Sequence, residues 1–161
     1  MRARPHVFVA CPSPPFDATV LRRRLERIVR RGAPVLRLDP GDVRVRVVDA
    51  GTMLELGRRH LGKTYATDVL AFPDDARGGD VALCWPVLRA QAEDGPLQEA
   101  LRLCVHGLCH LAGYDHDEPR RARAMLRLER TILRRGGVPD VVRPYDPAAR
   151  GRADAGRLRG G

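Results

Sequence analysis

The stretch HGLCHLAGYDH, residues 106 to 116, holds three of the chain's five histidines at spacings of four and six residues. On a helix, side chains four residues apart lie on one face with β-carbons about 5 to 6 Å apart, so His106 and His110 can bind one ion. Gly113 permits a reversal of the chain, because glycine adopts left-handed conformations without a steric penalty, and His116 can then return to the same ion. The stretch therefore predicts a helix with a metal site at its carboxyl end.

Three histidine ligands would leave one position of a tetrahedral zinc ion open. Structural zinc sites are generally closed by four protein ligands, whereas three ligands and a water form the catalytic arrangement. A bound zinc lowers the pKa of its water to about 7. We predict one Zn²⁺ per chain, held by His106, His110 and His116, without Cys109 as a ligand. Three nearby carboxylates could orient a ligating ring: Asp115, Asp117 and Glu118.

The same stretch also matches, position for position, the zinc-protease pattern HExxHxxGxxH. In that pattern the glutamate next to the first histidine is the general base. Gly107 occupies this position here, and a glycine side chain cannot accept a proton. A metallopeptidase is therefore the disfavoured alternative.

Hydrophobic periodicity predicts strands and helices along most of the remaining chain. Strands are predicted at 6–11, 42–49, 67–73 and 80–84. Helices are predicted at 17–31, 51–62, 86–93, 97–111 and 120–135, with Asp17 as a cap and Gly62 and Gly113 as ends. We expect one domain over residues 1–138, followed by a flexible tail at 139–161 that is rich in arginine and glycine.

The charge of the chain favours a polyanionic partner. The net charge is +9 and the pI is about 10.6, and cations that neutralise phosphates release counterions from nucleic acid. Lys63 is the one lysine among the 29 cationic residues, so a genome-wide preference for arginine is an alternative explanation. One helical stripe of arginines could contact phosphate or simply face solvent: Arg120, Arg123, Arg127, Arg130 and Arg134.

The composition also indicates a compartment. No segment approaches the roughly 18 to 20 consecutive apolar residues of a membrane helix, and the amino-terminal apolar run is too short for a signal peptide. The four cysteines form no CxxC pair and lie among apolar residues, as reduced buried thiols do. We expect a cytoplasmic protein that does not contact the membrane.

The histidine stretch and several segments before it resemble the motifs of a known family. HGLCHLAGYDH closely resembles the HGxLHLxGYDH signature of the YbeY family, bacterial single-strand-specific endoribonucleases associated with ribosomal RNA maturation. Upstream elements match in the expected order: VRVVD at 45–49, GK at 62–63, TDVLAFP at 67–73 and GDVAL at 79–83. The resemblance extends over roughly residues 42 to 137.

The resemblance implies an α+β fold in which a small mixed β-sheet packs with helices around a zincin-like three-histidine site. It implies that His106, His110 and His116 ligate zinc. It further implies single-stranded RNA as substrate, action at the 3′ end of small-subunit 16S ribosomal RNA, a place in ribosome quality control, and the small ribosomal subunit as a partner.

Two positions depart from the family pattern. Leu61 stands where the family has an arginine important for activity, and Ala71 stands where it has a serine. Arg59, or secondarily Arg58, is the candidate to bind the scissile phosphate, and Arg58, Arg59 and Lys63 are the candidate RNA-binding residues. A ribosome- or RNA-binding assembly factor, with a mainly structural metal and weak or absent catalysis, is the alternative function.

Overall fold

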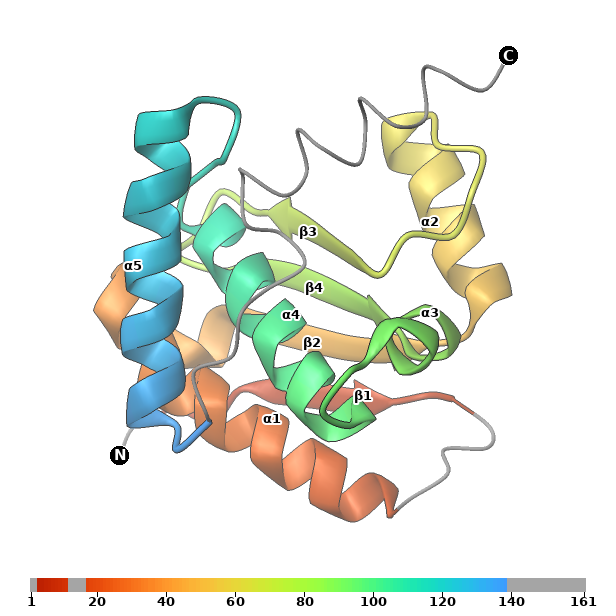
Figure 1. Cartoon of the computed structure of the whole chain (residues 1–161), viewed down its shortest axis with the longest axis horizontal. Helices are drawn as coiled ribbons and strands as arrows, with labels where there is room; N and C mark the ends of the chain where they lie inside the picture. Colours follow the sequence, from red (N-terminus) through yellow and green to blue (C-terminus); the bar gives the residue numbers. More distant parts are fainter. Residues whose placement is uncertain (1–2, 12–16, 139–161) are drawn as a thin grey trace.

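The computed structural model describes residues 3–11 and 17–138, which form a four-stranded mixed sheet flanked by helices (Figure 1). The strands are β1 (His6–Val9), β2 (Val43–Val48), β3 (Val69–Pro73) and β4 (Gly79–Cys84). Their order is β1-β2-β4-β3; β1, β2 and β4 are parallel, and β3 is antiparallel to β4. The predicted α+β class and mixed sheet are confirmed.

Five helices lie in the described part of the chain. They are α1 (Ala18–Gly32), α2 (Ala50–Leu61), α3 (Trp85–Gln91), α4 (Pro96–Leu111) and α5 (Pro119–Arg135). Every predicted strand and helix is present within two residues of its predicted ends, while two short 3₁₀ turns, Ala33–Leu36 and Pro40–Asp42, were not predicted. None of these helices is long and apolar enough to cross a membrane. The predicted tail at 139–161 lies outside the described residues.

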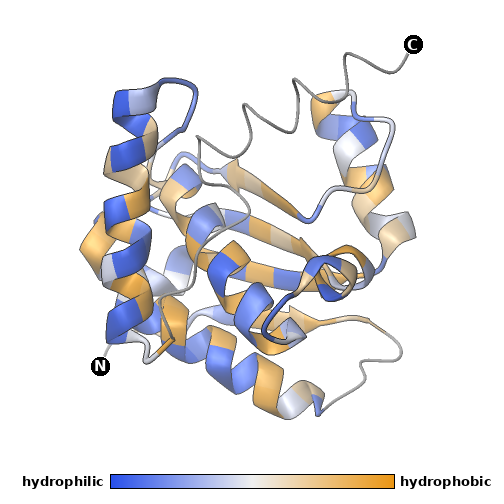
Figure 2. Ribbon diagram, viewed as in Figure 1, coloured by the Kyte–Doolittle hydropathy of each residue, from blue (hydrophilic) through white to orange (hydrophobic). Residues whose placement is uncertain are grey.

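The sheet buries apolar side chains on both of its faces. Figure 2 shows hydrophobic residues along its strands and along the helices that pack on it. Alternate residues of β4 point in opposite directions, so Val81 and Leu83 join the main core beside α1, α4 and α5. Ala82 and Cys84 point the other way and pack with Met53 of α2. Consequently α4 and α2 lie on opposite faces of the sheet.

Helix α4 is the central element of the main core (Figure 1). The sequence predicts one apolar face on it, with Leu97, Leu101, Cys104 and Leu108, but every residue from 99 to 109 is buried. The reason is that α1, α3 and α5 cover the sides that the sheet leaves open. The charged Arg102 is buried with them and is paired, since its guanidinium donates to both carboxylate oxygens of Asp94.

Gly107 sets how closely α4 approaches the sheet. A β-carbon built at this position would lie 2.7 Å from Cγ1 of Val81 and 3.1 Å from its Cγ2. Real β-carbons essentially never make contacts below 3.0 Å, so the backbone of α4 packs directly on the side chain of Val81 in β4. Any side chain at position 107 would have to displace Val81 or move the helix away from the strand.

Replacing Gly107 with alanine is expected to lower the free energy of unfolding by about 1 to 3 kcal/mol, because the added methyl overpacks this contact. Urea unfolding followed by circular dichroism measures the effect. Gly51→Ala is the matched control: it lies in α2, where the nearest atom to an added β-carbon is 3.7 Å away. The control should be neutral or stabilising, because alanine favours helix over glycine. Equal stability of Gly107→Ala and the parent would contradict the close packing.

Candidate metal centre

The structure brings the three predicted histidines together. His106 and His110 lie one turn apart near the end of α4, and His116 lies in the segment between α4 and α5. One ring nitrogen from each of the three falls within 4.8 Å of the other two. The Nε2 atoms of His106 and His110 are 3.1 Å apart.

Backbone hydrogen bonds at the end of α4 return His116 to the cluster. Gly113 has a φ of 89°, which a side chain would make unfavourable. The amide of Tyr114 donates to the carbonyl of Cys109 at 3.0 Å, closing the helix end in the manner of a Schellman motif. The carboxylate of Asp115 then accepts the amide of His116 at 2.7 Å. The loop is therefore fixed on both sides of its glycine.

The ring nitrogens of His106 and His110 are close enough to bind a single metal ion. Two nitrogens that each lie about 2.0 to 2.1 Å from one ion can be at most about 4.2 Å apart. The 3.1 Å between the Nε2 atoms of His106 and His110 is within that limit, and a ring nitrogen of His116 lies within 4.8 Å of both. Burial and, after it, the neighbouring His106 and His116 lower the pKa of His110 to about 4. At neutral pH this ring is uncharged, so its lone pair is available for a metal. Imidazole ligands suit zinc, and also copper, iron and nickel.

A buried carboxylate orients the first ring. Nδ1 of His106 lies 2.8 Å from Oε1 of Glu129 on α5, and both side chains are almost completely buried. With Nδ1 directed to this carboxylate, Nε2 faces the other histidines. Histidine ligands almost always donate their second nitrogen to a carboxylate, carbonyl or water, and this bond fixes the tautomer. The contact therefore prepares His106 for a metal.

Sequence reasoning missed Glu129. The three nearby carboxylates that it considered have other surroundings: Asp115 accepts a backbone amide, Asp117 pairs with Arg121, and Glu118 precedes α5 as an exposed residue. The available signal was the position of Glu129 in the apolar stripe of α5, four residues after Met125 and three before Ile132. A charged residue within a buried stripe needs a partner.

The predicted RNA-binding residues lie on another element. Arg58 and Arg59 are in the last turn of α2, and Lys63 follows the helix end at Gly62. Arg59 is 73% exposed and lies 3.5 Å from Glu55, one turn earlier, rather than against the histidine cluster. Leu61 is 52% exposed beside them. The structure thus groups these cations at the end of α2, on a helix that packs against the opposite face of the sheet from α4.

Gly107 bears on the peptidase alternative as well. A β-carbon at Gly107 would point toward the side chains of Val81 and Val69 in the sheet. A glutamate here would have to displace strand side chains before it could reach the histidines. Cys109, which also lies between two histidines in the sequence, is fully buried and outside the group of possible ligands.

Comparison with known proteins agrees with this geometry. The family model described as Endoribonuclease YbeY matches residues 15–137, which include α1 and extend beyond the resemblance predicted from motifs. The chain belongs to the YbeY family. An Endoribonuclease YbeY from Stenotrophomonas maltophilia (strain R551-3) is 41% identical over 123 residues, which cover 68% of this chain and 74% of the relative.

Other relatives support the same assignment. A second Endoribonuclease YbeY, from Stenotrophomonas maltophilia (strain K279a), is 37% identical over 150 residues, covering 84% of this chain and 89% of the relative. The solution structure of TM1509 from Thermotoga maritima superimposes with a TM-score of 0.55 at 24% identity, covering 81% of this chain and 87% of that one. The latter similarity shows a shared fold.

Replacing Glu129 with glutamine is expected to weaken zinc binding by roughly 10- to 100-fold, because the anion that holds His106 is lost while the shape of the side chain is kept. Competition with a chromophoric zinc chelator measures the affinity. Asp117→Asn is the matched control, since it removes an exposed carboxylate that pairs with Arg121. Equal affinity of Glu129→Gln and the parent, or an equal loss in Asp117→Asn, would remove the orienting role from Glu129.

Proposed function

We propose that this YbeY-family chain is a zinc-dependent, single-strand-specific endoribonuclease that acts in ribosomal RNA maturation. Its proposed substrate is the 3′ region of small-subunit 16S ribosomal RNA. We further propose that it acts in ribosome quality control and is located in the cytoplasm. The observation that supports this best is the cluster of His106, His110 and His116, which offers one ring nitrogen each within 4.8 Å. Curated relatives with the name Endoribonuclease YbeY support RNA cleavage as the reaction.

Three histidines, one carboxylate and the loop after α4 would each contribute to binding one ion. Zinc held by the three histidines would supply a Lewis acid and a water of lowered pKa. Glu129 keeps Nε2 of His106 directed toward the site, and the loop closed by Gly113 keeps His116 there. The low pKa of His110 keeps its ring unprotonated at neutral pH. The chain therefore presents neutral nitrogen donors without having to expel a proton from His110.

Cleavage of a phosphodiester also needs cations near the nonbridging oxygens, where negative charge develops. Arg59 is the proposed group for the scissile phosphate, with Arg58 as the substitute and Lys63 as a further RNA contact. A guanidinium can bind a phosphate through two parallel N–H groups. The exposure of Arg59 and its long contact with Glu55 leave its side chain able to turn toward a bound strand.

The alternative is an RNA- or ribosome-binding assembly factor with a mainly structural metal. The observation that favours it is Leu61, an exposed apolar side chain where the family pattern has an arginine. Zinc-loaded protein that binds single-stranded RNA and never cuts it would decide for this alternative.

The parent protein is expected to cut single-stranded RNA in a zinc-dependent manner, and His110→Ala should reduce the rate to background because one of three ligands is removed. Gel analysis of an end-labelled RNA measures cleavage, with EDTA and zinc re-addition as metal controls. His60→Ala is the matched control, because His60 packs its ring against Phe72 outside the cluster. His110→Ala that cuts as fast as the parent would contradict the proposed function; Arg59→Ala that cuts and binds normally would remove only the role of Arg59.

A further inference from the structure

Two helices hold all of the chain's net positive charge. Helices α1 and α5 contain 13 of the 29 cationic residues and two of the 20 acidic ones, a charge of +11 compared with +9 for the whole chain. All other residues together therefore sum to −2. A genome-wide preference for arginine would distribute the excess over every element, so it does not explain this concentration.

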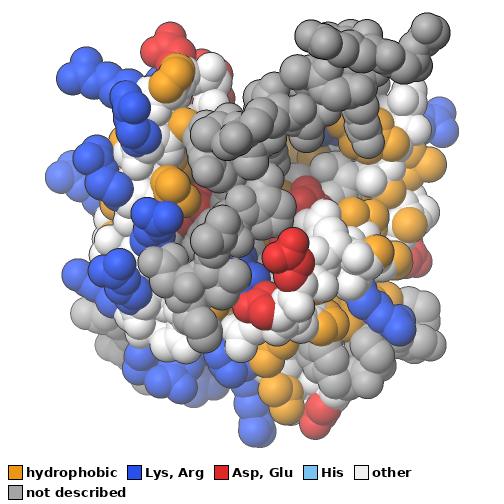
Figure 3. Space-filling view, in the orientation of Figure 1, with side chains coloured by type: hydrophobic (Ala, Val, Ile, Leu, Met, Phe, Trp, Pro, Cys, Tyr) orange, Lys and Arg blue, Asp and Glu red, His pale blue; other side chains and the backbone are white. Residues whose placement is uncertain are grey.

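These two helices pack side by side and turn their arginines outward. A β-carbon on Gly32 of α1 would lie 2.6 Å from Cγ2 of Ile132, so the helices are in direct contact. Each helix buries one apolar side, and Figure 3 shows Lys and Arg side chains along the outer side of α5. We define the basic face as six exposed arginines: Arg30 on α1 and Arg120, Arg123, Arg127, Arg130 and Arg134 on α5.

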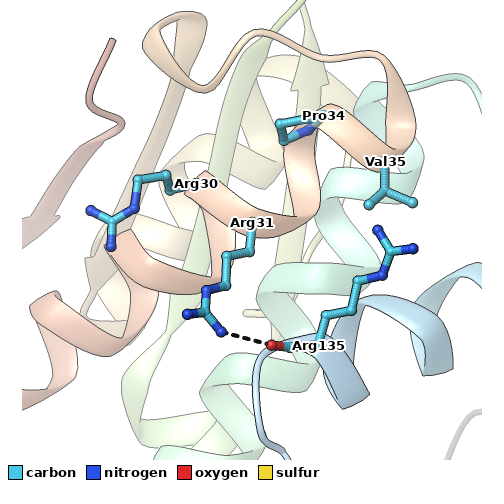
Figure 4. A pocket seen from close by; sticks show the side chains of 5 residues that line it. All are labelled: Arg30, Arg31, Pro34, Val35 and Arg135. Carbon is cyan, nitrogen blue, oxygen red and sulfur yellow. Dashed lines mark hydrogen bonds between the residues drawn. The ribbon is translucent and has the colours of Figure 1, made fainter. Parts of the chain in front are cut away.

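A hollow marks the place where the two helices end together (Figure 4). It has a volume of about 780 Å³ and is lined by Arg30, Arg31, Pro34, Val35 and Arg135. Arg31 donates from Nη1 to the carbonyl of Arg135 at 2.9 Å, as Figure 4 shows. Cations near helix carboxyl ends also offset the helix dipole. The arginines of the hollow thus have a structural role in addition to any binding role.

The first half of α5 has no such structural explanation. Arg120, Arg123 and Arg127 follow at spacings of three and four residues, so like charges lie next to one another, which destabilises a helix. No described residue forms an ion pair with Arg123 or Arg127, and the acidic residue of α5, Glu129, is turned inward to His106. Neighbouring cations that repel one another on an exposed helix side are suited to a polyanion.

The dimensions of the row suit an extended strand. At a rise of about 1.5 Å per residue, the five arginines of α5 extend over about 21 Å with a cation about every 5 Å. The row begins four residues after His116, so one end of it adjoins the loop of the metal centre. Helix α5 contains no aromatic residue on which a base could stack, so backbone phosphates are the groups that this surface can recognise.

We propose that the basic face binds the phosphodiester backbone of the RNA substrate outside the metal centre and holds the strand along α5. This inference rests on the proposed RNA cleavage and names a second surface for the same substrate. Because arginine–phosphate contacts release counterions, binding through this face must weaken as salt rises, and removing an arginine from the face must lower that salt dependence.

The test compares four proteins that should share one melting temperature. The double variant Arg123→Gln/Arg127→Gln removes two charges from the basic face, and Arg123→Lys/Arg127→Lys keeps them. Arg46→Gln/Arg89→Gln removes the same charge from exposed arginines of β2 and α3. Fluorescence anisotropy with a labelled single-stranded RNA of about 20 nucleotides, in EDTA to suppress cleavage, gives the affinity over a range of salt concentrations.

The glutamine variant of the basic face is expected to bind more weakly than the parent. Its slope of log affinity against log salt should be shallower by about 1.4, or about 0.7 for each arginine that no longer pairs with a phosphate of a single strand. The lysine variant and the Arg46/Arg89 variant should keep the parent slope. An unchanged slope in the glutamine variant, or an equal change in the Arg46/Arg89 variant, overturns the inference while RNA cleavage by the parent still stands. A parent that neither binds nor cuts RNA overturns the proposed function itself.

Discussion

The contact between the backbone of α4 and β4 at Gly107 is the constraint on which the rest of the molecule depends. Because Gly107 has no side chain, the backbone of α4 packs directly on the Val81 side chain, so α4 lies deep in the core and other helices can close over it. At 100° per residue, His106 and His110 lie about 100° and 60° around the helix from Gly107. The ligand pair is therefore beside the contact with the sheet, where Nδ1 of His106 meets Glu129 of α5. Gly107 therefore affects both how α4 packs on the sheet and where the two histidine side chains lie.

Helix α5 has two functions on its two sides. Its buried side places Met125 and Ile132 in the core and Glu129 against His106. Its outer side presents the arginines of the basic face. A rigid helix therefore connects the metal centre to a surface suited to phosphate. In the proposed arrangement the same helix positions both the RNA strand on the basic face and the ion at the three histidines.

Local spacing predicted a large part of this structure from the sequence. The interval of four residues between His106 and His110, the glycine at 113 and the alternation in β2 each specify a local geometry that needs no knowledge of the rest of the chain. Family motifs added the mixed sheet. The features derived from spacing share one property, since each follows from residues that are near one another in sequence.

The features that sequence reasoning missed depend on contacts between distant residues. Glu129 meets His106 across 23 positions and two helices, so no local spacing could select it over Asp115 or Asp117. Residues 99–109 of α4 are all buried because α1, α3 and α5 lie around the helix, whereas the sequence predicted burial of one face only. The face of the sheet on which Arg59 lies likewise follows from strand order. The periodicity of a single sequence does not show which strands and helices, far apart in that sequence, pack together.

We propose that His106, His110 and His116 bind one zinc ion through ring nitrogens while its fourth position stays open to solvent. X-ray absorption at the zinc edge on zinc-loaded protein is the decisive measurement. The expected result is a shell of nitrogen and oxygen at about 2.0 to 2.1 Å, with the outer-shell pattern of three imidazoles. A sulfur shell at about 2.3 Å, or zinc that fails to load in stoichiometric amount, would contradict it.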